Sequence, residues 1–323
     1  MDRAEGARPS RSHHLRPGRS RSFANGNATF QVASSVALST AKEARTFPRE
    51  ETPYPPRPVA TILDQIIDHK RTEIARLPAV DRKALSELPP TRGFRAALQR
   101  PKGERIRVIA ECKKGSPSKG IFVQDYDPVL TAYKYQLGGA SCLSVLTDEK
   151  FFFGHADHLK AVHAQVSLPA IRKDFVIDDR QIAQARQWGA DAVLLIAACL
   201  SDGQMEDLQG LAWDLGLDVL VEVHDAEEAM RALKIKANLV GVNNRNLKDF
   251  SISLKTTYDL LPALLGGGRV VVSESGISHR EQCHELEEAG VDAVLVGESL
   301  ITSADPSAAL AKLRGTIVRG VVG

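Results

Sequence analysis

Lysine and carboxylate side chains stand at or near the ends of apolar segments in this chain. Lys173 ends the segment LPAIRK, and Glu111 and Lys113 stand two residues apart at the end of IRVIAECK. Glu222 lies within the apolar segment VLVEV. Such groups exchange protons with a substrate when burial or a neighbouring charge tunes their pKa values. The residue types therefore predict general acid–base chemistry.

Strand periodicity predicts which of these side chains lie together. Side chains alternate along a strand, so Glu111 and Lys113 share one face, whereas Cys112 points the other way, toward the helices. Burial within VLVEV is expected to raise the pKa of Glu222 toward the range useful for proton transfer. His224 shares the face of Glu222, although a histidine at this position is more often a structural residue at a strand edge.

A further polar group follows the segment NLVGV. Asn243 and Arg245 are predicted to share one face, and Asn244 the other. An arginine there can form two parallel hydrogen bonds to a carboxylate or phosphate, and Asn243 can hold a hydroxyl or orient a carboxylate. These residues extend the predicted site toward an anionic substrate.

The elements that must position these residues are eight apolar, β-branched segments, each followed by a stretch with helical spacing. Eight strand–helix units are what a closed (β/α)8 TIM barrel needs, and such barrels carry their chemistry at the carboxyl ends of the strands. The likeness of WGADAVLLIA to AGVDAVLVGE, four units later, supports the count. The segments are IRVIAECKKGSPS, ASCLSVLTD, LPAIRKDF, DAVLLIAACL, DVLVEVHD, NLVGVNNRNL, RVVVSESGIS and DAVLVGESL.

Gly276 and Gly297 follow the seventh and eighth of these segments. In (β/α)8 barrels the loops after these two strands commonly bind phosphate through backbone N–H groups, and glycine allows close approach. A single glycine is more often a simple turn residue, but two at adjacent strand ends favour a phosphate site. A phosphorylated substrate is therefore predicted.

The chain divides into three predicted parts. Residues 1–58 are expected to be a disordered tail or a transit segment, because residues 6–42 contain no acidic residue and no apolar periodicity. Residues 59–104 are expected to be a helical extension, with a helix capped by Thr61 and carrying Asp64 in its first turn, and a shorter one in RGFRAAL. This extension is expected to close one end of the barrel or to overlie its mouth. Residues 105–320 form the predicted barrel.

Composition excludes several classes of protein. The formal net charge is +2, from 42 Lys and Arg against 40 Asp and Glu, which argues against a nucleic-acid or membrane-surface protein. The four cysteines form no C-x-x-C pair, so a reduced cytoplasm is expected, with a plastid as the alternative if the tail is a transit peptide. No apolar stretch approaches the ~20 residues of a membrane span. A soluble monomer is expected, since no exposed apolar face stands out.

Taken together, the motifs resemble the indole-3-glycerol-phosphate synthase family. The resemblance extends from about Ala60 to Gly320 and implies a carboxy-lyase of tryptophan biosynthesis. The family converts 1-(2-carboxyphenylamino)-1-deoxyribulose 5-phosphate to indole-3-glycerol phosphate, carbon dioxide and water. The motifs that carry the resemblance are ECKKGSPS, SVLTDEKFF, RKDF, LVEVHD, GVNNRNL, SESGIS and LVGESL.

The resemblance implies a role for each catalytic residue. Lys173 would be the general acid for ring closure, and Glu222 the general base of the later steps. Lys113 would engage the substrate carboxylate and share in proton transfer during dehydration, while the division of acid roles between the two lysines stays open. The remaining polar contacts implied are Glu111, Asn243 and Ser275.

The resemblance also implies the binding residues. Phosphate would be held by Ser116, Gly276, Gly297 and the backbone of Glu298, where some relatives carry serine. Phe152, Phe175 and Leu194 would form an apolar bed for the anthranilate ring. Arg245 and Glu274 complete the expected binding residues. No metal or organic cofactor is implied, and association with other tryptophan-pathway enzymes is a possible partnership.

Two alternatives stay open at this point. A phosphoribosylanthranilate isomerase also uses a phosphate-binding barrel, but it needs a cysteine and an aspartate as its acid and base, and Cys112 is predicted to face away from the mouth. A phosphate-ligand-binding barrel without catalysis would need the set Lys113, Lys173 and Glu222 to be incomplete, and it is complete.

Overall fold

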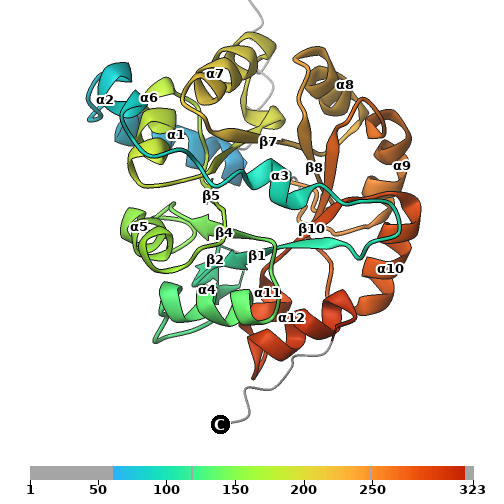
Figure 1. Ribbon diagram of the computed structural model, residues 1–323. Coiled ribbons are helices and arrows are strands. Elements are labelled where there is room, and N and C mark those ends of the chain that lie inside the picture. Colours follow the sequence, from blue (N-terminus) through green and yellow to red (C-terminus); the bar gives the residue numbers. More distant parts are fainter. Residues whose placement is uncertain (1–60, 118, 248, 317–323) are drawn as a thin grey trace, which may run out of the picture. The chain divides into compact units, whose positions relative to one another are not determined.

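Eight short parallel strands pair side by side into a closed barrel (Figure 1). Its β-branched segments form strands because both faces of each are buried, one inside the barrel and one against helices. The predicted (β/α)8 TIM barrel is confirmed in this computed structural model, which describes residues 61–117, 119–247 and 249–316. In barrel order the strands are β1 (Arg107–Cys112), β4 (Cys142–Leu146), β5 (Ala170–Lys173), β6 (Ala192–Ile196), β7 (Asp218–Val223), β8 (Leu239–Asn243), β9 (Val270–Glu274) and β10 (Ala293–Val296).

Helices follow the strands and form the outer layer (Figure 1). Most begin at a side chain that accepts a backbone N–H, such as Asp127, Asp178, Ser201, Asp225 and Asp305. The helices are α4 (Pro128–Leu137), α5 (Ala156–Gln165), α6 (Asp179–Gln187), α7 (Asp202–Asp214), α8 (Ala226–Lys234), α9 (Lys255–Leu264), α10 (Arg280–Ala289), α11 (Glu298–Ile301) and α12 (Pro306–Arg314).

Three short elements between the barrel strands and helices were not predicted. An antiparallel hairpin of β2 (Gly115–Ser116) and β3 (Gly120–Ile121) follows β1, and the 3-10 helix η1 (Ala197–Cys199) follows β6. Each is too short to show a hydrophobic period, which explains why the sequence pattern does not reveal it.

Alternation along the strands produces two hydrophobic layers. Ile109 and Leu220 lie in the cluster inside the barrel, whereas Val108 and Cys112 lie in the cluster between strands and helices. The predicted outward direction of Cys112 is confirmed, because this thiol shares the outer cluster with Tyr135 of α4.

The segment before the barrel contains α1 (Ile62–Ile74), α2 (Arg82–Ser86) and α3 (Phe94–Leu98). The predicted cap of α1 is confirmed as a reciprocal pair: Thr61 Oγ1 accepts the N–H of Asp64 at 3.2 Å, and the Asp64 carboxylate accepts the N–H of Thr61 at 2.8 Å. The short helix in RGFRAAL is also confirmed, as α3, whereas α2 was not predicted.

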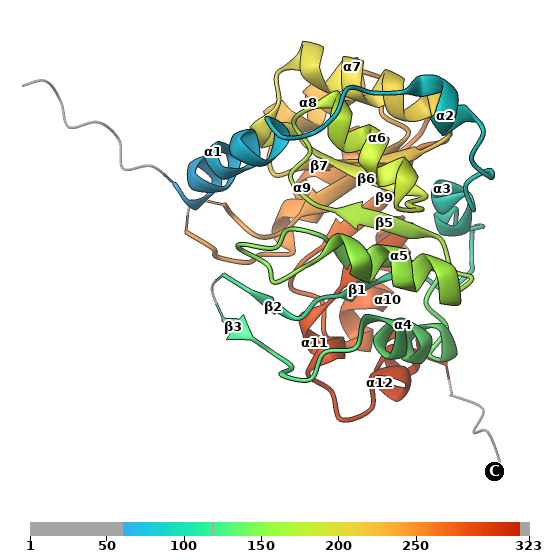
Figure 2. The same ribbon diagram turned by 90° about the vertical axis from the view of Figure 1, so that its left-hand side faces the viewer.

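These helices lie at opposite ends of the strands, as Figure 2 shows for α1 and α3. Phe94 and Leu98 of α3 are fully buried within the inner cluster, and the N–H of Arg95 donates to Asp218 where β7 begins. Helix α3 therefore closes the amino end of the barrel. Ile66 of α1 contributes to a cavity at the carboxyl end. The two expected placements, closing an end and overlying the mouth, both occur.

All described residues belong to one compact unit. The predicted tail, residues 1–58, lies outside the described residues. None of the helices in the described part is long and apolar enough to cross a membrane.

Closure by α3 is testable through stability. Phe94→Ala removes a fully buried ring from the inner cluster and should lower the free energy of unfolding by about 3–5 kcal/mol. Leu137→Ala, at a half-exposed position of α4, should change it by less than about 0.5 kcal/mol. Urea unfolding followed by circular dichroism measures both, and equal small effects would contradict this role of Phe94.

Candidate active site

A cavity of about 440 Å3 opens at the carboxyl ends of the strands. It is concave, mixed polar and apolar, and of the size that small-molecule sites have. Every residue predicted for the site lines this cavity, namely Lys113, Glu111, Ser116, Phe152, Lys173, Phe175, Leu194, Glu222, Asn243, Arg245, Glu274, Ser275, Gly276, Gly297 and Glu298.

The polar floor of the cavity is one layer of the barrel. Glu111, Lys173, Glu222 and Glu274 come from β1, β5, β7 and β9, which are alternate strands, and alternate strands supply the members of one layer. Two residues before each of them, the same strands place an apolar side chain in the inner cluster. These apolar residues are Ile109, Ile171, Leu220 and Val272. A charged layer therefore lies directly on an apolar one.

Lys173 is the cation of this layer. Its Nζ lies 2.9 Å from Glu222 Oε2 and 3.4 Å from Glu274 Oε2. Burial disfavours the ammonium, but the carboxylates of Glu222, Glu274 and Glu111 outweigh this effect and raise the pKa of Lys173. Lys173 is therefore protonated at neutral pH and can donate a proton.

The prediction that the pKa of Glu222 is raised is wrong. Burial does raise its pKa, but the Lys173 ammonium and His224 outweigh that effect and lower the pKa below its ordinary range. Asn243 Nδ2 also donates to Glu222 Oε1 at 3.1 Å, which favours the carboxylate. Glu222 is therefore an ionised acceptor of protons.

The carboxyl group with a raised pKa is that of Glu274 instead. Burial and the negative charges of Glu222 and Glu111 raise its pKa to about 7, against the opposing effect of Lys173. Its Oε1 has no hydrogen-bond partner among the described residues. Gly241 of β8 makes room for this oxygen, because a Cβ at position 241 would collide with it. The sequence indicated Glu274 as a binding residue and missed this property.

Glu111 and Lys113 form the ion pair that their shared face predicted, with Nζ and Oε1 2.5 Å apart. Gly297 faces this pair: a Cβ at position 297 would lie 2.6 Å from Glu111 Oε1. The glycine after β10 therefore leaves room for the Glu111 carboxylate, in addition to any role near phosphate.

His224 is more closely tied to the site than the sequence indicated. Its Nε2 lies 3.2 Å from Glu222 Oε1, and its Nδ1 lies 2.9 Å from Glu228 Oε2. Burial lowers the pKa of His224, but these two carboxylates outweigh burial and raise the pKa to about 10. A second cation thus stabilises the Glu222 carboxylate.

The predicted phosphate side lies across the ends of β9 and β10. Ser275 and Gly276 both have positive φ, +66° and +80°, and such strain at a non-glycine residue is typical of functional turns. The Glu298 side chain is turned to Lys119 of the hairpin, with Nζ and Oε1 2.5 Å apart. Gly297 and Glu298, at the start of α11, both line the cavity.

The apolar bed, defined as Phe152, Phe175 and Leu194, comes from the loops after β4 and β5 and from the middle of β6. The rings of Phe152 and Phe175 lie 5.9 Å apart with their planes at 39°. Three residues of α1 also line the cavity, namely Ile62, Leu63 and Ile66. Sequence reasoning did not name them as site residues, although the helical spacing of Ile62 and Ile66 was visible.

Cys112 does not line the cavity, and burial raises its pKa well above the ordinary thiol value. The isomerase alternative therefore lacks its cysteine acid at this position. Within residues 61–117, 119–247 and 249–316, no group of three or more His, Cys, Asp or Glu side chains is placed to hold a metal ion.

The fold and the cavity define a (β/α)8-barrel protein with an acid–base site at the carboxyl ends of its strands. The model of the indole-3-glycerol phosphate synthase family matches residues 63–313. The chain belongs to the indole-3-glycerol phosphate synthase family.

Individual relatives agree with this assignment. The chain is 50% identical over 263 residues to an indole-3-glycerol phosphate synthase of Variovorax paradoxus, covering 78% of this chain and 98% of that protein. It is 46% identical over 264 residues to one of Azoarcus sp., covering 80% and 100%. Among solved structures, a 3-hexulose-6-phosphate synthase matches 66% of this chain and 100% of its own with a TM-score of 0.52 and 18% identity, which supports the fold alone.

The contacts of His224 predict a pH dependence of stability. Because its folded pKa is raised, its contribution is fully present below the unfolded value near 6.5 and is lost as pH rises through about 10. The stability advantage of the wild type over His224→Gln should fall by on the order of 3 kcal/mol between pH 7 and pH 10. Urea unfolding of both proteins at each pH measures it, and a constant difference would contradict the assigned contacts.

Proposed function

We propose that this chain performs the indole-3-glycerol phosphate synthase reaction with Lys173 as acid and Glu222 as base. The substrate is 1-(2-carboxyphenylamino)-1-deoxyribulose 5-phosphate, and the products are indole-3-glycerol phosphate, carbon dioxide and water. The single observation that carries these roles is the Lys173 ammonium held between two buried carboxylates at the strand ends. Family membership supplies the reaction.

Ring closure requires an acid at the substrate ketone. The aromatic carbon that bears the carboxylate attacks the ketone carbon, and a proton passes from Lys173 Nζ to the ketone oxygen, which becomes a hydroxyl. The C–C bond to the carboxylate then breaks, carbon dioxide leaves, and the electron pair returns to the ring system. The carboxylates around Lys173 keep it protonated despite its burial, so the acid enters this step with its proton.

Dehydration requires a base that removes a proton from the intermediate and an acid that protonates the leaving hydroxyl. Glu222 enters as a carboxylate and removes a proton from the carbon next to the one that bears the hydroxyl, and a C=C bond forms between these two carbons. The hydroxyl leaves as water with a proton from a lysine. Lys113, which pairs with Glu111, lines the same cavity. It binds the anthranilate carboxylate and shares the proton transfer to the leaving hydroxyl. Asn243 and the neighbouring Ser275 supply further polar contacts.

Binding follows the two sides of the cavity. The apolar bed takes the anthranilate ring, while Ser116, Gly276, Gly297 and the Glu298 backbone take the phosphate, with Arg245 and Glu274 at the sugar. A monomer as the active unit is part of this proposal. Association with other enzymes of the pathway stays part of this proposal.

We further propose that residues 59–104 function as an extension of the 105–320 barrel, since α1 and α3 contact its two ends. A cytoplasmic location is proposed because the four cysteines are free thiols, three of them buried.

The proposal is tested by incubating the purified protein with the ribulose phosphate substrate, without added metal, and following indole-3-glycerol phosphate by fluorescence. Product formation is expected, with no conversion of phosphoribosylanthranilate. Folded protein that forms no product would remove the proposed function.

The acid role of Lys173 predicts a specific loss. Lys173→Met keeps an unbranched apolar side chain but removes the ammonium, so it should lower kcat by about 10²–10⁴-fold, the usual contribution of a positioned acid. Glu222→Gln should lower kcat similarly, because the amide cannot accept a proton. Lys234→Met removes an exposed lysine of α8 and should leave kcat unchanged. A near-normal kcat in either site variant would refute the roles.

A further inference from the structure

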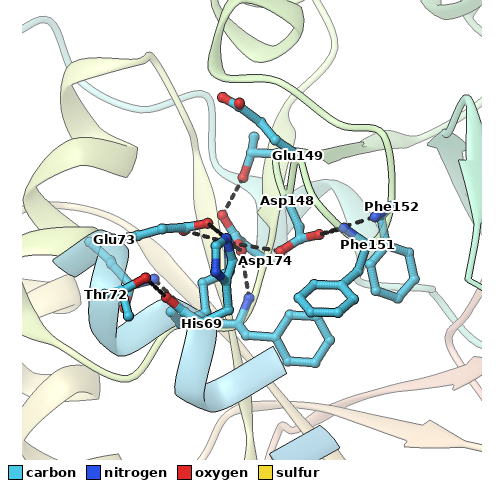
Figure 3. Close-up of polar contacts among 12 residues, drawn as sticks. His69, Thr72, Glu73, Asp148, Glu149, Phe151, Phe152 and Asp174 are labelled. Atoms are coloured by element: carbon cyan, nitrogen blue, oxygen red, sulfur yellow. Dashed lines mark hydrogen bonds and ion pairs between the residues drawn. The ribbon is translucent and has the colours of Figure 1, made fainter. Parts of the chain in front are cut away.

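A buried lysine of the N-terminal helix lies outside the residues assigned to the reaction. Lys70 of α1 is 1% exposed, and its Nζ lies 2.9 Å from a carboxylate oxygen of each of Glu73, Asp148 and Asp174. Figure 3 shows these three carboxylates converging between α1 and the strand ends. A buried ammonium is costly unless carboxylates compensate it, and here three do.

The two aspartates hold the backbone of the apolar bed. Asp148 Oδ1 accepts the N–H groups of Phe151 at 2.7 Å and Phe152 at 3.0 Å, so it closes the turn that follows β4 (Figure 3). Asp174 Oδ1 accepts the N–H of Phe175 at 2.8 Å directly after β5. Lys70 therefore contacts the two side chains that fix where both rings of the bed begin.

Asp174 also has hydrogen-bond partners at the strand ends that do not involve α1. Asp174 Oδ2 accepts from Thr147 at 2.7 Å and from Arg172 at 2.9 Å, which joins β4 to β5. Helix α1 joins through Lys70, and Ile66, one turn earlier, faces the cavity. A shift of Lys70 would therefore move the wall of the cavity that faces the bed.

We propose that Lys70 is a positioning residue for substrate binding: it couples the docking of α1 to the turns that carry Phe152 and Phe175. This inference rests on the proposed function, because it names the same substrate. Lys173 is held separately, by Glu222 and Glu274 on other strands. Loss of Lys70 should therefore weaken binding of the anthranilate ring more than proton transfer.

The first test is Lys70→Met, which keeps an unbranched apolar side chain one atom shorter than lysine and removes the charge. KM for the ribulose phosphate substrate should rise about tenfold or more, with kcat within about threefold of wild type. The matched control is Arg71→Met, at the next position of α1, where the exposed guanidinium pairs with Asp68. Its KM and kcat should equal those of wild type. A KM for Lys70→Met equal to that of this control overturns the proposal.

A second variant separates positioning from stability. Lys70→Met leaves buried carboxylates without their cation, so its thermal midpoint should fall. The double variant Lys70→Met/Asp148→Asn removes one of those charges, and the amide oxygen that replaces the carboxylate can still accept from Phe151 and Phe152. The midpoint should return toward wild type while KM stays raised. If KM returns together with the midpoint, Lys70 is a structural residue and the proposal is overturned.

A measurement on the wild type covers the case in which these variants do not fold. Binding of indole-3-glycerol phosphate should slow amide hydrogen exchange in α1 and in residues 148–152 together, with no change in α12. Unchanged exchange in α1 overturns the coupling. A wild type without any turnover would instead overturn the proposed function, whereas a normal KM in Lys70→Met alongside an active wild type overturns the role of Lys70 alone.

Discussion

The ammonium of Lys173, buried between Glu222 and Glu274, is the interaction on which the site depends. A lone lysine in this position would lose its proton to burial, and two carboxylates prevent that. The barrel supplies this arrangement because alternate strands deliver side chains to one layer. In this barrel the layer at the strand ends consists of Glu111, Lys173, Glu222 and Glu274 instead of apolar side chains. The packing geometry of the barrel therefore brings acids and bases together.

This layer holds more carboxyl groups than cations, so its carboxyl groups differ in protonation. Glu222 has the cations Lys173 and His224 beside it and stays ionised, whereas Glu274 has an unpartnered oxygen among the described residues and a pKa of about 7. Two carboxyl groups of one type thus differ in protonation near neutral pH. The glycine at position 241 belongs to the same arrangement, since it leaves space for the Glu274 carboxyl.

Much of the fold follows from periodicity, and strand alternation placed Glu111 with Lys113 and turned Cys112 away. Cavity residues such as Ser116, Phe152 and Leu194 were expected only from the family resemblance. Interactions between strands do not follow from it. The pKa of Glu222 was predicted in the wrong direction because its neighbour Lys173 is 49 positions away. Nothing in the sequence around Lys70 distinguishes it from a solvent-facing helix charge, because its aspartate partners follow two distant strands. Hairpin β2–β3 and helix α2 were too short to leave a periodic signal.

The central claim is that Lys173 is protonated between an ionised carboxylate and a carboxyl group that titrates near neutral pH. NMR titration of carboxyl carbons in glutamate-labelled protein, with Glu222→Gln and Glu274→Gln for assignment, tests it most directly. The predicted result is that Glu274 titrates near pH 7 while Glu222 stays ionised well below its ordinary pKa of 4.5. Titration of both carboxyl groups together near 4.5 would contradict the account.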